Sequence, residues 1–219
     1  TGAPAKGWLP GFEAQSARAT VNAGAKAEAW AERLWSAGIR SVLLEPAALE
    51  NAADLKAFLS FYEKFLDALA ARPENGLREE RLEAFLEGGP TRVPGIDILS
   101  ELAYGPEGEV FTSEYALRSV PSLKLGFAGR MRYRDIAAQP AARACLAATH
   151  ADNQPLCSGC AYQAFCTIAP SKSLAKQGSV WGRMPESLSC ALHMGILDLA
   201  FARLSKEKGP FATRWDALR

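Results

Sequence analysis

The sequence lacks an excess of either charge, a long apolar run and a signal-peptide pattern. Its 219 residues carry 25 Lys and Arg against 24 Asp and Glu, a net charge of +1. A dedicated nucleic-acid-binding domain usually has a clear basic excess, so no nucleic-acid partner is expected. No apolar run approaches the roughly 18 residues that a transmembrane helix needs. We therefore expect a cytoplasmic protein with no membrane partner.

Histidine and the common nucleotide-binding loops are also scarce or missing. His150 and His193 are the two histidines, and no sequence context places either of them in a catalytic triad. Neither a G-x-G-x-x-G pattern nor a Walker pattern occurs, so nucleotide binding through those loops has no support. Hydrophobic residues nevertheless make up 48% of the chain, which indicates a folded globular protein.

Hydrophobic periodicity predicts an α/β chain. Two β-rich runs, 17–21 and 39–44, flank a predicted helix at 25–37, which favours a βαβ unit with parallel strands over two strands of a mixed sheet. Apolar residues at three- and four-residue steps predict a helix at 52–71, whose apolar face is interpreted as core and not as a cofactor site. Further helices are predicted at 77–86, 138–149 and 187–206, and a hairpin at 101–104 and 109–112.

Cysteines carry the strongest chemical signal. Their number is odd, and four of the five lie in the last third of the chain, which disfavours a disulfide framework. Cys157, Cys160, Cys166 and Cys190 follow the spacing C-x2-C-x5-C-x23-C, and Gly159 is expected to relieve the tight backbone of the C-x2-C turn. Four thiolates suit a [4Fe–4S] cluster or a tetrahedral zinc ion. Zinc sites more often pair two C-x2-C knuckles, whereas one is present here.

The surroundings of these cysteines resemble a known family. The run from Cys157 to Cys166, with Pro170, Gly182-Arg183-Met184-Pro185 and Ser189-Cys190 after it, is similar to the SPASM/twitch auxiliary-cluster region of radical SAM peptide maturases. It looks most like the B-type maturase of the His-Xaa-Ser peptide system. The segments 102–114 and 123–126 resemble the family's hairpin and the short segment after it. Residues 41–46 look like part of the last strands of a radical SAM partial barrel.

The resemblance implies that Cys157, Cys160, Cys166 and Cys190 bind one outer auxiliary [4Fe–4S] cluster. Two positions depart from the fuller SPASM pattern. Pro170 stands where that pattern has a further cysteine, and Thr112-Ser113 stand where its hairpin has one. We therefore expect a single auxiliary cluster. Cys145 is expected to be a buried apolar thiol and not a fifth ligand.

The C-x3-C-x2-C loop that binds S-adenosylmethionine in this family is absent from the sequence. Because the chain also begins at Thr1 instead of Met, two explanations stay open. Either the chain is the C-terminal part of a longer enzyme, or it is a shortened relative that acts as a non-catalytic partner. S-adenosylmethionine and a second [4Fe–4S] cluster are expected only if further residues precede Thr1.

Three other groups of residues are weighed against simpler interpretations. His193 lies three residues after Cys190 and either tunes the metal site or is a partly exposed helix histidine. The basic run 130–134 either contacts an acidic peptide or is a solvated strand face. Tyr162 and Phe165, between the cysteines, are expected to shield the cluster from water.

Together these observations predict a partial parallel β/α barrel over residues 1–94. A β-hairpin and a cysteine-rich helical iron–sulfur module are predicted over residues 95–219. The resemblance implies radical modification of a ribosomally made precursor peptide, in which the auxiliary cluster serves either electron transfer or peptide positioning, with a companion maturase subunit as a further partner. The alternative is a peptide-binding subunit that does not cleave S-adenosylmethionine, in which the four cysteines hold a structural cluster or zinc.

Overall fold

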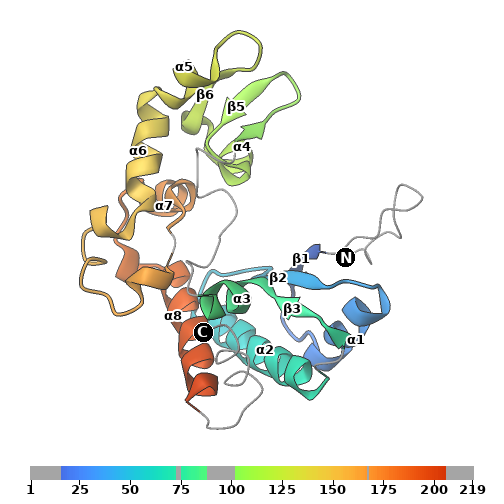
Figure 1. Cartoon of the computed structure of the whole chain (residues 1–219). Coiled ribbons are helices and arrows are strands. Elements are labelled where there is room, and N and C mark those ends of the chain that lie inside the picture. The colour runs from blue at the N-terminus through green and yellow to red at the C-terminus, as the bar shows by residue number, and fades with distance from the viewer. Residues whose placement is uncertain (1–15, 73–74, 88–101, 167, 206–219) are drawn as a thin grey trace. The chain divides into compact units, whose positions relative to one another are not determined.

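The computed structural model describes residues 16–72, 75–87, 102–166 and 168–205 (Figure 1). These residues form two compact units, one from within 1–89 and 188–219 and the other from within 90–187. The predicted boundary at residue 94 lies outside the described residues. Residues 95–219 were predicted to form one module, whereas the last helix belongs to the first unit. Within the described ranges, no helix combines the length and apolar character needed to cross a membrane.

The first unit alternates strands and helices and ends with a helix from the other end of the chain. Its elements are β1 (Ser16–Val21), α1 (Ala27–Ser36), β2 (Ser41–Pro46), α2 (Ala52–Ala71), β3 (Arg78–Glu79), α3 (Glu80–Leu86) and α8 (Leu188–Leu204).

The three strands of this unit form a parallel sheet in the order β1-β2-β3. Ser16 pairs with Ser41 and the register continues without a break to Val21 and Pro46, which confirms the predicted parallel βαβ unit. Arg78 pairs with Ser41, so β3 adds a third parallel strand that the sequence analysis had assigned to a helix. The described strands do not close into a barrel, and the architecture shown is α/β.

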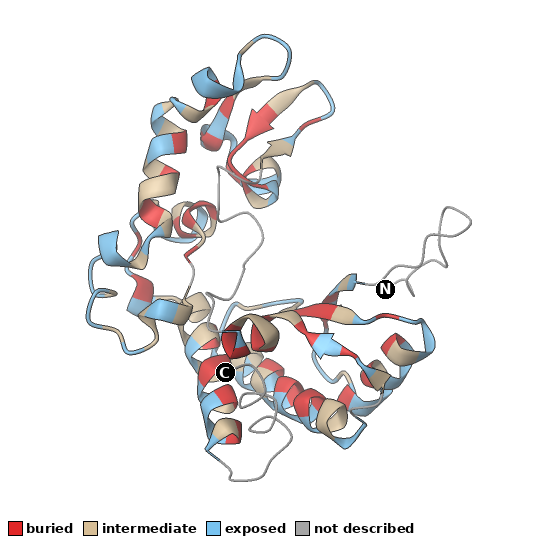
Figure 2. Ribbon diagram, in the orientation of Figure 1, coloured by how far each residue is buried: buried red, intermediate tan, exposed pale blue. Residues whose placement is uncertain are grey.

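Helix α2 spans the predicted residues 52–71 because its ends and its apolar face are both encoded locally. The Asn51 side chain caps its N-terminus by accepting hydrogen bonds from the backbone N–H of Ala53 at 2.8 Å and of Asp54 at 3.1 Å. Figure 2 shows the buried face of this helix. Its buried residues are Phe58, Phe61, Tyr62, Phe65 and Leu66.

Helix α8 packs against α2 within the first unit. The buried Arg203 side chain bonds to the Asp67 carboxylate at 2.6 Å and to the Glu63 carbonyl oxygen at 2.8 Å. Gly195 lies so close to α2 that a Cβ there would be 2.5 Å from Cδ1 of Leu59. These contacts explain why this helix belongs with the first unit.

The second unit is built on a small antiparallel sheet in the order β4-β5-β6. Ala103 pairs with Phe111, which confirms the predicted hairpin. The third strand and several short helices were not predicted. The elements are β4 (Ala103–Tyr104), β5 (Glu109–Phe111), α4 (Glu114–Ser119), η2 (Pro121–Leu123), β6 (Lys124–Phe127), α5 (Tyr133–Ala137), α6 (Pro140–Thr149), η3 (Ala151–Asn153), η4 (Gln163–Phe165), α7 (Pro170–Gln177) and η5 (Met184–Glu186).

Candidate functional site

The candidate site is the segment that carries Cys157, Cys160 and Cys166 in the second unit, between α6 and α7. It is a succession of tight turns. The backbone N–H of Cys160 bonds to the Cys157 carbonyl oxygen at 3.0 Å, and that of Gln163 bonds to the Cys160 carbonyl oxygen at 3.1 Å. The N–H of Cys166 in turn bonds to the Gln163 carbonyl oxygen at 3.2 Å. Each cysteine therefore stands at the end of a hydrogen-bonded turn, and all three are half-buried.

Gln154 anchors the start of this segment. Its side chain is buried, and its Nε2 donates to the carbonyl oxygens of Ala148 at 2.7 Å and Val180 at 3.4 Å. The first bond reaches the end of α6, and the second reaches the turn after α7. The Gln154 carbonyl oxygen also accepts a bond from the N–H of Cys157 at 3.2 Å. Its Oε1 is buried with no protein partner among the described residues.

A residue with a strained backbone, Leu156, immediately precedes the first cysteine of the segment. Leu156 has a φ of 71°, in the left-handed region that L-residues other than Gly, Asn and Asp rarely adopt. Its side chain is also 70% exposed. Gly159, which was expected to relieve the turn, has an ordinary φ and open space around it. The expectation for Gly159 is therefore wrong, because the left-handed backbone occurs three residues earlier, at Leu156. Backbone strain of this kind clusters at functional sites.

The Cys160 thiol lies close enough to Cys157 to affect the ionisation of Cys157. Burial raises the pKa of Cys157, and the neighbouring Cys160 raises it further. In the absence of a nearby cation, both effects disfavour the thiolate form of Cys157. A bound metal ion would reverse this effect, because a thiol that coordinates a metal loses its proton.

Cys190 lies on α8 in the first unit, not in the turn segment. Its Sγ lies 3.8 Å from Sδ of Met194, one helical turn later. His193 is on the same helix, three residues after Cys190, as predicted. In the described parts of the chain, no group of three or more His, Cys, Asp or Glu side chains is arranged to hold a metal ion. The structure thus brings Cys157 and Cys160 together in one turn, Cys166 follows in the same segment, and Cys190 belongs to the other unit.

The donor set fits an iron–sulfur cluster or zinc in its chemistry, because all four predicted ligands are sulfur atoms. The turn between Cys157 and Cys160 presents two of them side by side, which is what a C-x2-C knuckle contributes to such a site. The other two predicted ligands are Cys166 in the same segment and Cys190 on α8.

Buried hydroxyl groups of Thr112 and Ser113 lie where the fuller SPASM pattern has a hairpin cysteine, and Pro170, at the other such position, begins α7. Ser113 Oγ donates to Ser171 Oγ at 3.1 Å and accepts from the backbone N–H of Ala116 at 3.1 Å. Burial raises the pKa of Cys145, and a hydrogen bond with Thr112 partly opposes that shift. Cys145 is buried in α6, as expected. The side chain of Ser113 is therefore engaged in hydrogen bonds within the second unit.

The sequence analysis missed a buried polar cluster in the first unit, formed by Tyr62, Glu79 and Arg81. Glu79 is 1% exposed and accepts a hydrogen bond from Tyr62 Oη at 2.5 Å and from the N–H of Leu82 at 3.0 Å. Arg81 bonds to the carbonyl oxygen of Leu44, and its Nη1 lies 3.8 Å from Oε1 of Glu79. Burial raises the pKa of Glu79 while Arg81 opposes the shift. Nothing in the sequence indicated this cluster, because Glu79 and Arg81 are two of five charged residues within the predicted helix 77–86.

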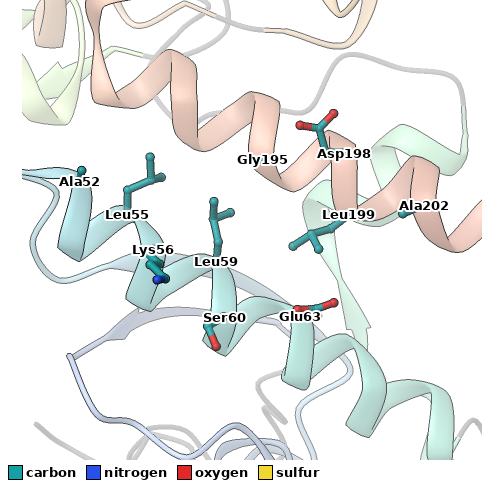
Figure 3. Close-up of a pocket in the computed structure, with 10 residues that line it drawn as sticks. All are labelled: Ala52, Leu55, Lys56, Leu59, Ser60, Glu63, Gly195, Asp198, Leu199 and Ala202. Atoms are coloured by element: carbon teal, nitrogen blue, oxygen red, sulfur yellow. The ribbon is translucent and has the colours of Figure 1, made fainter.

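An open groove of about 550 Å³ runs between α2 and α8 in the first unit (Figure 3). Leu55 and Leu59 point toward α8, and Leu199 points toward α2. Lys56, Glu63 and Asp198 lie at its edges and carry charges of both signs. The lining of the groove is mostly apolar.

Comparison with protein-family models, with curated proteins and with solved structures finds no match to this chain.

Proposed function

We propose that this chain is the auxiliary-cluster part of a radical SAM peptide maturase. In this proposal Cys157, Cys160, Cys166 and Cys190 hold one [4Fe–4S] cluster. The observation that carries the proposal is the hydrogen-bonded C-x2-C turn, in which the thiols of Cys157 and Cys160 lie close enough to shift the pKa of Cys157. The parallel βαβ unit supports the proposed origin of the first unit as the last strands of a β/α barrel.

The surroundings of the turn support a single cluster. Ser113 and Ser171 bond to one another where the fuller family pattern has additional thiolates nearby, and Pro170 begins α7. These residues offer no soft ligand for an inner cluster. When bound, the one cluster would supply a one-electron redox centre.

The chain's own residues would position that centre. Gln154 ties the cysteine segment to α6, and Tyr162 and Phe165 are half-buried between the second and third cysteines. Aromatic side chains at these positions would limit the access of water to the sulfur atoms. The substrate would be a ribosomally made peptide, and S-adenosylmethionine would bind elsewhere, to preceding residues of a longer chain or to a companion subunit.

Metal analysis of protein purified without oxygen tests the proposal. We expect about four irons and four sulfides per chain, with a brown absorbance that is lost in the Cys157→Ala, Cys160→Ala double variant. Cys145→Ala is the matched control, because it removes a buried thiol outside the proposed ligand set and should keep the iron. One zinc and no iron in protein never exposed to air would refute the redox role. That result would favour the alternative of a structural peptide-binding subunit.

A further inference from the structure

A cluster of positive charge surrounds β6 and the start of α5 in the second unit. Residues 124–135 contain Lys124, Arg130, Arg132 and Arg134 against a single acid, Asp135. The whole chain is nearly neutral, so this imbalance is local. All four basic side chains are exposed. Of the two interpretations of residues 130–134, contact with an acidic peptide or a solvated strand face, the strand is wrong, because these residues lie in a turn and in the first turn of α5.

Contacts with one aromatic ring hold two of these cations in place. Nζ of Lys124 lies 4.0 Å from the centroid of the Phe127 ring, and Cζ of Arg130 lies 5.0 Å from it. Cation–π contacts of this kind restrict long side chains that would otherwise sample many rotamers. A partner that binds them therefore loses less conformational entropy on binding.

The backbone that carries the cations is also held. The N–H of Ala128 bonds to the carbonyl oxygen of Gly108 at 2.7 Å, which ties the turn to the hairpin. Met131 packs against the backbone of Gly126, where a Cβ would collide with its sulfur atom. Met131 also contacts the cluster of Val110, Leu125 and Ile136 beneath it. The charged residues thus extend from a packed segment.

Few acids neutralise this surface. In the described part of the chain, Lys124, Arg130 and Arg132 make no ion pair, and Arg134 has only an exposed pair with Asp135 at 3.7 Å. Glu109 lies opposite Phe127 in the sheet, but its carboxylate lies against Gly105 on the β4 side of β5. The positive charge is therefore available to a partner.

We propose that Lys124, Arg130, Arg132 and Arg134 form a docking surface for a carboxylate-rich peptide segment. Guanidinium groups match carboxylates in geometry and bind them through two parallel hydrogen bonds. A nucleic acid fits less well, because two cations already occupy the Phe127 ring that a base would stack on. Identifying the segment as part of the modified peptide rests on the proposed function, whereas the binding itself does not.

Fluorescence anisotropy on the full chain tests this surface with a short labelled peptide of alternating glutamate and glycine. We expect saturable binding that weakens as salt is raised, and no binding of the matching glutamine–glycine peptide. The triple variant Arg130→Gln, Arg132→Gln, Arg134→Gln should bind at least about ten-fold more weakly. The control Arg118→Gln, Lys176→Gln, Arg183→Gln makes the same change in net charge at exposed positions of the same unit and should bind like the parent.

Equal weakening in both triple variants would refute a defined surface, as would tighter binding of oligothymidine or of phosphatidylserine vesicles than of the acidic peptide. Iron is measured on the same samples, so the two proposals are judged separately. If the protein contains iron but does not bind the peptide, the proposal of a docking surface is refuted and the proposed function is not. Peptide binding by a protein that contains zinc and no iron upholds the surface and refutes the redox function.

Discussion

The phenolic oxygen of Tyr62 donates a 2.5 Å hydrogen bond to Oε2 of Glu79, and both side chains are almost completely buried. The bond joins the middle of α2 to the start of α3, and Glu79 also caps α3 through the N–H of Leu82. A buried carboxylate is stable only when donors surround it. Donors come from Tyr62 and from the N–H of Leu82, and the positive charge comes from Arg81. The cluster therefore links α2 and α3 to the buried end of β3.

Tyr62→Phe should lower the free energy of unfolding by about 1–3 kcal/mol, because it leaves a buried oxygen of Glu79 without this donor and keeps the packing intact. Urea denaturation measures the change. Tyr104→Phe is the control, since Tyr104 is 59% exposed and should give the stability of the parent. Equal stability of the Tyr62→Phe variant and the parent would contradict the importance of this bond.

Glu79 should also make stability depend on pH. Burial raises its pKa in the folded state above the usual value of a glutamate, so the fold favours the protonated form. Its stabilising contribution is full below the unfolded-state pKa and is lost as pH rises through the folded-state pKa. The stability of the parent relative to Glu79→Gln should therefore fall as pH rises from about 4.5. Urea denaturation of both proteins at several pH values measures the difference. Glu87→Gln, at an exposed position, is the control. Parallel pH dependences of the parent and Glu79→Gln would contradict the prediction.

Leu156→Gly should raise the free energy of unfolding by about 0.5–1 kcal/mol. Glycine adopts the left-handed backbone without the steric cost of about 1–2 kcal/mol that a Cβ brings, although it loses more chain entropy on folding. Little apolar burial is lost, because the leucine side chain is mostly exposed. Leu156→Ala keeps the Cβ and is the matched control. If alanine stabilises as much as glycine, the strain assigned to this position is not present.

Gly195→Ala should have opposite effects in two backgrounds. In the parent it should lower the free energy of unfolding by about 1–2 kcal/mol, because the new methyl group collides with Leu59 and overpacks the contact of α2 with α8. In a Leu59→Ala background the collision is removed, and the better helix propensity of alanine should add about 1 kcal/mol. A double-mutant cycle measures the coupling, and additive effects would show that the two helices do not meet at this pair.

Much of the local structure was predictable from the sequence. The apolar spacing and the Asn51 cap of α2 are encoded in consecutive residues, and so are the hairpin at 103–111 and the burial of Cys145 in α6. Strand β3 was missed because two residues carry no periodicity, and its pairing with β2 depends on a partner far away in the chain. The same reason explains why the sequence analysis could not separate α8 from the second unit.

For the candidate site, the sequence determined which atoms are available: four thiols in a spacing that creates one C-x2-C turn. It also determined that the basic residues of 130–134 are close together. The tertiary structure alone decided that Leu156 is strained, that Gln154 anchors the turn, that Glu79 and Arg81 are buried together, and that two cations contact Phe127. Spacing along the chain records which side chains share a turn or a helix face. Burial, pKa and ion pairing depend on neighbours that are distant in sequence, and those neighbours are known only once the chain has folded.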